Sequence, residues 1–247
     1  MKTNQITAFG SRAAKLFSIT ALSIAMALSS CKKDSTAGNA VTEDEAAEVM
    51  VQAVDPASGG LALQTTAATT IALTNSSSAK CGVAKDSTIT GTGSTATRTY
   101  SYNLSWHRLL TCGVGSIPSK LDFTFTGGST YSGPRMSSDD NSTGAFTVTG
   151  LELGSSEYVV NQTYTRKGTQ QSKVRKNRSF SSTVNIITTD VKVSKATQQI
   201  TSGTGTVKVT GTASTGETFS YSATITFLGS KKANIVFASG TTYAVSW

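Results

Sequence analysis

The sequence is poor in the residues on which most enzyme chemistry depends. Its 247 residues include one histidine, three cysteines and three prolines, and only 15% are charged. Because His107 is the single histidine, a Ser-His-Asp or Cys-His mechanism would have to use it, and a histidine-rich metal site is excluded. The chain also lacks a G-x-S-x-G nucleophile motif and any spacing of acids that would pair two of them across a cleft. We therefore expect a protein that is not an enzyme and that needs no cofactor.

Long apolar runs are also scarce, since only Leu16 to Leu28 forms one. The basic residues Lys2, Arg12 and Lys15 precede this run, and no acid does. The run is too short to span a bilayer, and with its basic flank it is typical of a signal-peptide core. We expect residues 1–30 to be a signal peptide and no helix of the remaining chain to span a membrane.

Two processing sites follow the apolar run. Ala25-Met26-Ala27 matches ordinary signal cleavage, which would leave a secreted protein with a spare thiol at Cys31. Leu28-Ser29-Ser30-Cys31 resembles the lipobox of bacterial lipoproteins, and Cys31-Lys32-Lys33-Asp34 resembles the mature start of envelope lipoproteins from Bacteroidota-type bacteria. The resemblance implies lipid attachment at Cys31. Because Lys32 and not aspartate follows the cysteine, it also implies the outer membrane, on its periplasmic face or at the cell surface.

The two other cysteines are Cys81 and Cys112, each followed by glycine. In an oxidising envelope, two leftover cysteines are most simply joined, so we predict a Cys81–Cys112 disulfide.

Residues 31–41 are small and polar, which predicts a lipid anchor and flexible tether before a single β-rich domain over 42–247. The domain begins with Thr42-Glu43-Asp44-Glu45, a capping box with acids in the first turn. Apolar residues at helical spacing follow, so we predict a short helix over about 43–54. The region 61–80 is rich in alanine and threonine and is left unassigned.

From about residue 88 to 247 the period becomes two. In the stretch Thr97 to Leu110, the side chains of Tyr100, Tyr102, Leu104 and Trp106 alternate with small polar ones. Glycines between such runs, including Gly127-Gly128, Gly144, Gly203, Gly205 and Gly211, are interpreted as turns. The pattern predicts an all-β fold, an antiparallel meander of eight to eleven long strands. The meander forms either a curved sheet, or half-barrel, around the helix or a two-sheet sandwich.

One polar stretch could bind calcium. In Ser137 to Gly144, the residues Asp139, Asn141 and Thr143 alternate like oxygen ligands before a glycine. The set lacks the later bidentate glutamate of a full calcium loop, so an ordinary hairpin turn is the competing interpretation.

The most conspicuous local feature is a basic cluster between residues 166 and 178. It holds six cations, which are Arg166, Lys167, Lys173, Arg175, Lys176 and Arg178. Such a cluster attracts polyanions, and guanidinium groups match phosphate and carboxylate. Aromatic residues for base stacking are missing inside it, so no specific nucleic-acid site is expected. The competing interpretation is a solvated hairpin whose charges protect a sheet edge.

These observations favour a lipid-anchored, non-enzymatic envelope protein that binds a macromolecule or has a structural role. Its expected partners are the membrane, through Cys31, and an anionic glycan or lipopolysaccharide, through the basic hairpin 166–178. The alternative is a periplasm-facing carrier whose curved sheet encloses the acyl chain of a lipid or lipoprotein. Neither the ligand nor the oligomeric state follows from the sequence.

Overall fold

The computed structural model describes residues 40–75, 80–174 and 177–247. These residues belong to one compact unit, Thr36–Trp247. Its helices are α1 (Glu43–Val54), the short 3-10 turn η1 (Pro56–Ser58) and α2 (Leu61–Asn75). A second 3-10 turn, η2 (Val114–Ser116), lies between two strands. The strands are β1 (Ala84–Ser94), β2 (Thr99–Cys112), β3 (Pro118–Ser132), β4 (Met136–Thr149), β5 (Glu157–Ser172), β6 (Ser179–Ser194), β7 (Ile200–Ala213), β8 (Thr218–Gly229), β9 (Lys232–Phe237) and β10 (Thr242–Ser246).

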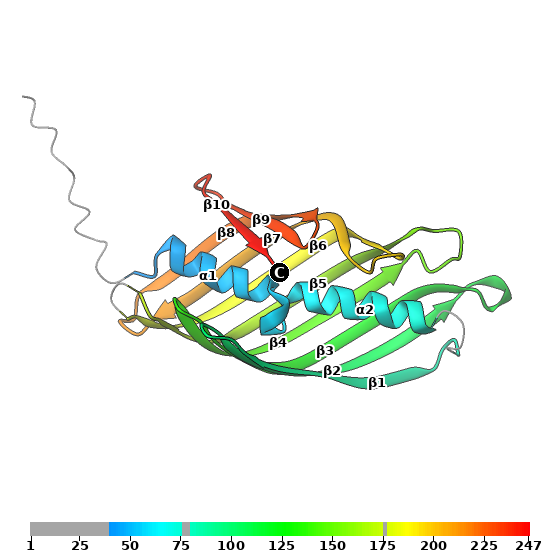
Figure 1. The fold of residues 1–247 in the computed structure, drawn as a ribbon, viewed down its shortest axis with the longest axis horizontal. Coiled ribbons are helices and arrows are strands. Elements are labelled where there is room, and N and C mark those ends of the chain that lie inside the picture. The colour runs from blue at the N-terminus through cyan, green and yellow to red at the C-terminus, as the bar shows by residue number, and fades with distance from the viewer. Residues whose placement is uncertain (1–39, 76–79, 175–176) are drawn as a thin grey trace, which may run out of the picture. The chain divides into compact units, whose positions relative to one another are not determined.

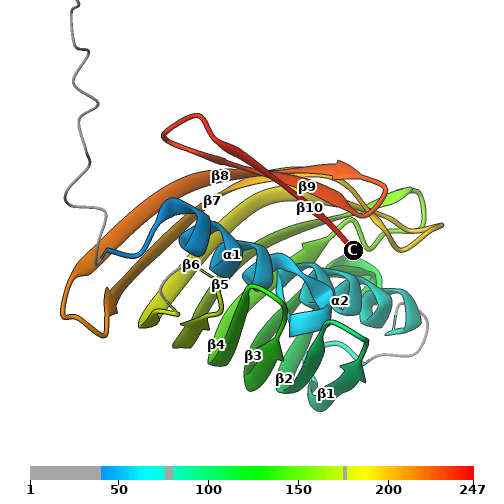
Figure 2. The same ribbon diagram turned by 60° about the vertical axis from the view of Figure 1, so that its left-hand side comes forward.

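All ten strands form one antiparallel sheet in which each strand pairs with its neighbours along the chain, from β1 to β10. The predicted meander is therefore confirmed. The sheet curves around the two helices, which lie one after the other on its concave face (Figures 1 and 2). Of the two architectures predicted, the curved sheet is correct, and the two-sheet sandwich was wrong because the meander is never interrupted by a change of sheet.

Aromatic rings lie over glycines on the concave face of the sheet. In each case the glycine is directly opposite the aromatic residue in the register, and a Cβ atom there would come within 2.5 Å of the ring or its hydroxyl. The pairs are Tyr102 with Gly91, Tyr100 with Gly93, Phe125 with Gly144 and Phe219 with Gly211. Glycines inside strands allow a sheet to bend, and a ring that covers the glycine restores the lost packing.

This packing corrects the interpretation of several glycines. Gly127, Gly128, Gly144, Gly203, Gly205 and Gly211 lie inside strands, although the sequence suggested turns. An isolated glycine marks a turn only if nothing needs the space where its side chain would be. In strand β4, Gly144 is required because the Phe125 ring fills that space.

Helix α1 begins and ends where the sequence predicted. The Thr42 hydroxyl accepts a hydrogen bond from the Glu45 amide at 3.3 Å, and the Thr42 amide donates to the Glu45 carboxylate at 2.9 Å, which completes the capping box. Its apolar side packs into the core shared with the sheet. The β9–β10 hairpin, which forms the last two strands of the sheet, packs against this helix (Figure 2).

Helix α2 occupies the region that the sequence left unassigned. It carries no charged residue and has little amphipathic character, so its periodicity gave no clear signal. The helix buries a small-residue face that includes Ala62, Thr65, Ala68 and Ala72, which lets its backbone approach the sheet closely. Several of its threonine hydroxyls, such as those of Thr66 and Thr70, donate to carbonyls four residues earlier and are thereby satisfied within the helix.

The predicted disulfide is confirmed. Cys81 and Cys112 are bonded, with their Cα atoms 5.7 Å apart. The bond ties the segment that leads into β1 to the end of β2, and it closes a loop of 31 residues. By the loop-entropy relation, such a bond contributes about 3 to 4 kcal/mol to stability.

The aromatic–glycine packing can be tested with one methyl group. We expect Gly144→Ala to lower the free energy of unfolding by about 1–3 kcal/mol, because its Cβ would overlap the Phe125 ring and the Thr163 carbonyl oxygen. Gly154→Ala is the matched control, since no atom lies within 4 Å of the added Cβ. Urea unfolding measures both, and a loss at Gly144 no larger than that at Gly154 would contradict the packing account.

Candidate functional site

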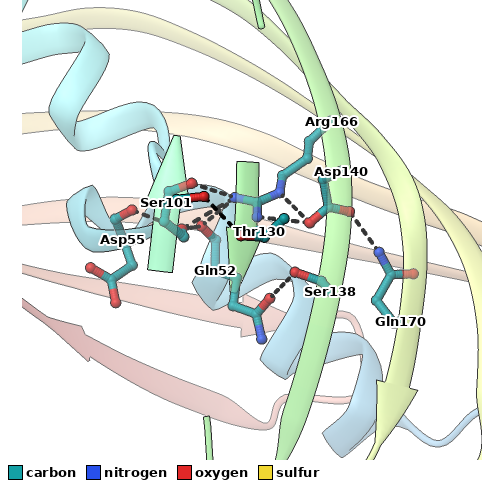
Figure 3. Close-up of polar contacts among 9 residues, drawn as sticks. Gln52, Asp55, Ser101, Thr130, Ser138, Asp140, Arg166 and Gln170 are labelled. Carbon is teal, nitrogen blue, oxygen red and sulfur yellow. Dashed lines mark hydrogen bonds and ion pairs between the residues drawn. The ribbon is translucent and has the colours of Figure 1, made fainter. Parts of the chain in front are cut away.

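The predicted basic cluster is not one surface, because two of its arginines are buried in the domain. Arg166 is 2% exposed and projects from β5 toward helix α1 (Figure 3). Its Nη2 lies 2.8 Å from Asp140 Oδ2, and its Nη1 donates to the carbonyl oxygens of Gln52 and Ser58 at 3.0 and 3.2 Å. Gln52 lies in the last turn of α1, where carbonyls lack partners within the helix and the helix dipole favours a cation. Arg166 thus stabilises the C-terminal end of α1.

The charge of Arg166 is balanced within the core. Asp140 on β4 is also 2% exposed, and its second oxygen accepts a hydrogen bond from Gln170 Nε2 at 2.8 Å. The Ser138 hydroxyl donates to Gln52 Oε1 at 3.1 Å, which extends the network along β4 (Figure 3). Burying two charges is costly unless both are paired and hydrogen-bonded, and here both are.

Arg178 is buried at the opposite end of the same helix. Its Nη1 lies 3.2 Å from Glu45 Oε2, the carboxylate of the capping box, and also donates to the Ala40 carbonyl. The expectation that Arg166 and Arg178 are solvent-facing anion ligands was therefore wrong. A cluster of basic residues in a sequence does not reveal which of its side chains point inward. Here, Arg166 and Arg178 bind the two ends of α1 to the sheet.

The other acids of α1 also have partners on the sheet. Tyr243 donates to Asp44 at 2.6 Å, Ser239 donates to Glu43 at 2.9 Å, and Arg135 lies 3.7 Å from Glu48. Burial, followed by its hydrogen bond to Asp44 and the charge of that carboxylate, raises the pKa of Tyr243 to about 12. Helix α1 is thus fixed to the sheet by most of its charged side chains.

The remaining members of the cluster differ in position. Lys167 and Lys173 are exposed, and Lys173 Nζ donates to the Ser132 hydroxyl at 2.7 Å. Arg175 and Lys176 lie outside the described residues, as do Cys31 and the lipobox.

The calcium candidates do not form a loop. Asp139, Asn141 and Thr143 lie within strand β4 and point away from the helices. Side chains on one face of a strand are about 7 Å apart, too far to converge on one ion, so the calcium-loop interpretation was wrong. The competing interpretation, a hairpin turn, was also wrong, because residues 137–144 lie inside the strand. In the described part of the chain there is no group of three or more His, Cys, Asp or Glu residues that could hold a metal.

His107 also points away from the helices, as expected from the inward position of Trp106. Its Nδ1 lies 2.8 Å from Asp86 Oδ1, and both side chains are exposed. The pair is therefore an exposed contact between β1 and β2 on the face away from the helices.

The convex surface of the sheet carries a regular polar pattern that the sequence alone did not show. We call this surface the outer face. From β1 to β8 its side chains align in three rows, which we call the outer-face array. The first row is Thr88, Ser105, Thr126, Thr143, Thr165, Asn185, Lys208 and Ser222; the second is Thr90, Asn103, Gly128, Asn141, Lys167, Thr183, Thr210 and Ser220; the third is Thr92, Ser101, Thr130, Asp139, Thr169, Ser181, Thr212 and Thr218.

The array consists almost entirely of hydroxyl and amide side chains. Neighbouring strands are about 4.8 Å apart, so adjacent members of a row can hydrogen-bond, as Ser101 with Thr130 and Thr165 with Asn185 do at 2.9 Å. Its only charged members are Lys167, Lys208 and Asp139. Two adjoining hollows of about 580 and 560 Å³ lie over β4–β8 and share Ser181 and Thr212. Lys167 lines the second hollow.

Comparison of the chain with known protein families, with curated proteins and with solved structures finds no match. Within the described ranges, neither helix is long and apolar enough to cross a bilayer.

The buried arginine can be tested by removing its charge. We expect Arg166→Gln to lower the free energy of unfolding by about 3–5 kcal/mol, because Asp140 would remain buried without its counter-charge. The control is Arg98→Gln, which removes a half-exposed ion pair to Asp55 with a 3.7 Å separation. That change should cost less than about 1 kcal/mol in urea unfolding.

A double variant separates the charge from the packing. Arg166→Met combined with Asp140→Leu should recover much of the stability lost in Arg166→Gln, since no unpaired charge is left. Equal stability of Arg166→Gln and Arg98→Gln would contradict the conclusion that Arg166 holds α1 to the sheet through a buried ion pair.

Proposed function

We propose that the protein is a non-enzymatic envelope lipoprotein, anchored in the outer membrane through lipid on Cys31, that binds an acidic polysaccharide with its outer-face array. The observation that supports this proposal is the alignment of hydroxyl and amide side chains across eight strands. These groups both donate and accept hydrogen bonds, as sugar hydroxyls do.

The chemistry of the array favours a polymer over a single sugar. Each hydroxyl contact replaces a contact with water and is therefore weak on its own. Rows that repeat every 4.8 Å or so offer many such contacts to one extended chain, and linked weak contacts add through their high effective concentration.

The cations of the array favour an acidic chain. Lys167 and Lys208 are exposed on the outer face, two strands apart, and neither lies within ion-pair distance of a carboxylate in the described ranges. Lys167 is the member of the predicted basic cluster that this proposal retains. The proposal thus moves the expected anionic contact from the hairpin 166–178 to the outer face.

The predicted anchor would join the domain beside the β5–β6 turn. The described chain starts at Ala40, whose carbonyl accepts a hydrogen bond from Arg178 in the segment between these two strands. Residues 32–39 would add at most about 28 Å of fully extended chain between this point and Cys31, since each residue adds about 3.5 Å.

The alternative role, carriage of an acyl chain within the curved sheet, would need space on the concave face. The two helices fill most of this face with buried side chains, and the space that remains beside α2 is an open groove of about 390 Å³ and not an enclosed cavity. We therefore place polysaccharide binding first.

Charge reversal on the outer face tests the proposal. We expect Lys167→Glu with Lys208→Glu to weaken binding to polygalacturonate at least about tenfold, because a lysine near an anionic surface contributes on the order of 1 kcal/mol. Binding by the wild-type protein should also weaken as salt is raised. Affinity electrophoresis in gels with and without the polymer measures both effects.

The charge-matched control is Lys231→Glu with Lys232→Glu, two exposed lysines at the β8–β9 turn, outside the array. This variant should bind like the wild type. An equal loss in both variants would indicate only non-specific attraction, and unchanged binding in both would remove the array from consideration.

The anchor is tested separately in cells. We expect wild-type protein to incorporate labelled palmitate and to remain in the membrane fraction, whereas Cys31→Ala should lose the label and leave that fraction. A Cys81→Ala, Cys112→Ala variant controls for the other thiols and should keep the label. Label that persists in Cys31→Ala would refute lipid attachment at this residue.

A further inference from the structure

A groove lies between helix α2 and the first strands of the sheet, at the β1 edge, and Thr88 is the one residue that it shares with the array. Its volume is about 390 Å³, within the usual range of small-molecule sites. The helix supplies Leu63, Thr66, Ala67, Thr70 and Ile71, and the sheet supplies Ser87, Thr88, Ile89 and Arg108. The groove is therefore a surface made by both elements.

The helical wall of the groove is largely apolar, although two of its residues are threonines. Its five residues follow the spacing of one helix face. The Thr66 and Thr70 hydroxyls donate to the carbonyls of Ala62 and Thr66 at 3.0 and 2.9 Å, so their protons are directed mainly into the helix and their methyl groups remain for apolar contact. With Leu63, Ala67 and Ile71, this wall offers contacts to a hydrocarbon chain.

Arg108, at one end of the sheet wall, has a second cation, Lys85, beside it, and neither has a counter-charge among the described residues. Lys85 on β1 is directly opposite Arg108 on β2, and both lie on the face that carries Ser87 and Ile89. Arg108 Nη1 donates a hydrogen bond to the Ser87 hydroxyl at 3.1 Å. Within the described ranges, no carboxylate lies at ion-pair distance from either cation. Like charges directly opposite each other in a sheet repel, and an anion between them would relieve this repulsion.

The two edges of the sheet differ in how they meet the helices. At the β10 edge, Tyr243 reaches Asp44 of α1 and the strand packs over the helix. At the β1 edge, the strand pairs only with β2, and the groove remains between it and α2. Among the described residues, no strand covers the groove at the β1 edge.

We propose that this groove binds a long-chain fatty acid, with the hydrocarbon chain along α2 and the carboxylate between Lys85 and Arg108. An apolar channel with cations at one end is complementary to a single-chain anionic amphiphile. This site is separate from the hollows over β4–β8, because no residue lines both, and Thr88 is the only residue that it shares with the outer-face array.

The test uses the mature chain with Cys31→Ala, so that no detergent is needed. Displacement of a fluorescent fatty acid by oleate reports binding, and oleyl alcohol, which has the same chain without the charge, reports the role of the carboxylate. We expect saturable binding of oleate, and binding of the alcohol at least tenfold weaker.

Two variants test the two parts of the groove. Lys85→Gln with Arg108→Gln should weaken oleate at least tenfold and remove the preference over the alcohol, whereas Ala67→Phe should fill the channel and weaken both ligands. Arg98→Gln, at the β1–β2 turn, is the control and should bind oleate like the parent. Absence of saturable oleate binding by the parent, or oleate affinity unchanged in both Lys85→Gln/Arg108→Gln and Ala67→Phe, would overturn the proposal. If the charge variant does not fold, the Ala67→Phe result decides.

Discussion

The architecture depends on a buried ion pair between Arg166 and Asp140. The guanidinium reaches from the sheet to the last turn of α1, and the carboxylate that balances it is held by a neighbouring strand. With Arg178 at the other end of the helix, this pair fixes both the position and the length of α1 on the concave face. A buried charge whose partner is missing destabilises the fold more than an apolar residue at the same place would. The contacts of Arg166 and Asp140 are therefore expected to form together.

The two faces of the sheet differ in composition, because only the concave face packs against the helices. Every second side chain points to the concave face, where aromatic rings over glycines allow the curvature that surrounds the helices. The alternate side chains form the outer-face array, which makes no contribution to the core and is available for a partner. Helix α2 has no charged side chain. Its hydroxyls donate to Gln162 of β5, from Thr65, and to Gln198 of the β6–β7 turn, from Thr70. The groove therefore lies beside the less firmly held helix.

Much of the fold could be predicted from periodicity. The capping box located α1, the alternation located the strands, and short connections implied a meander, because these signals are local. Helix α2 was missed because its apolar and polar residues show little helical periodicity and because threonine has a low helix propensity. Gly144 and similar glycines were misinterpreted because the ring that needs the space lies on another strand.

The site was harder to predict for the same reason. Arg166 and Lys167 are adjacent in sequence, yet Arg166 is buried and Lys167 is exposed. Arg166 can be buried because Asp140, on the neighbouring strand β4, balances its charge, and the sequence near residue 166 does not reveal that partner. The outer-face array depends on the pairing register of eight strands, and the sequence of one strand does not specify its register with the others.

The most direct test of the central claim is lysine labelling of the mature protein, followed by mass spectrometry, with and without polygalacturonate. The account predicts that the polymer protects Lys167 and Lys208, while labelling of Lys85, Lys231 and Lys232 stays unchanged. Uniform labelling at all five lysines, or protection confined to the last three, would contradict recognition by the outer face.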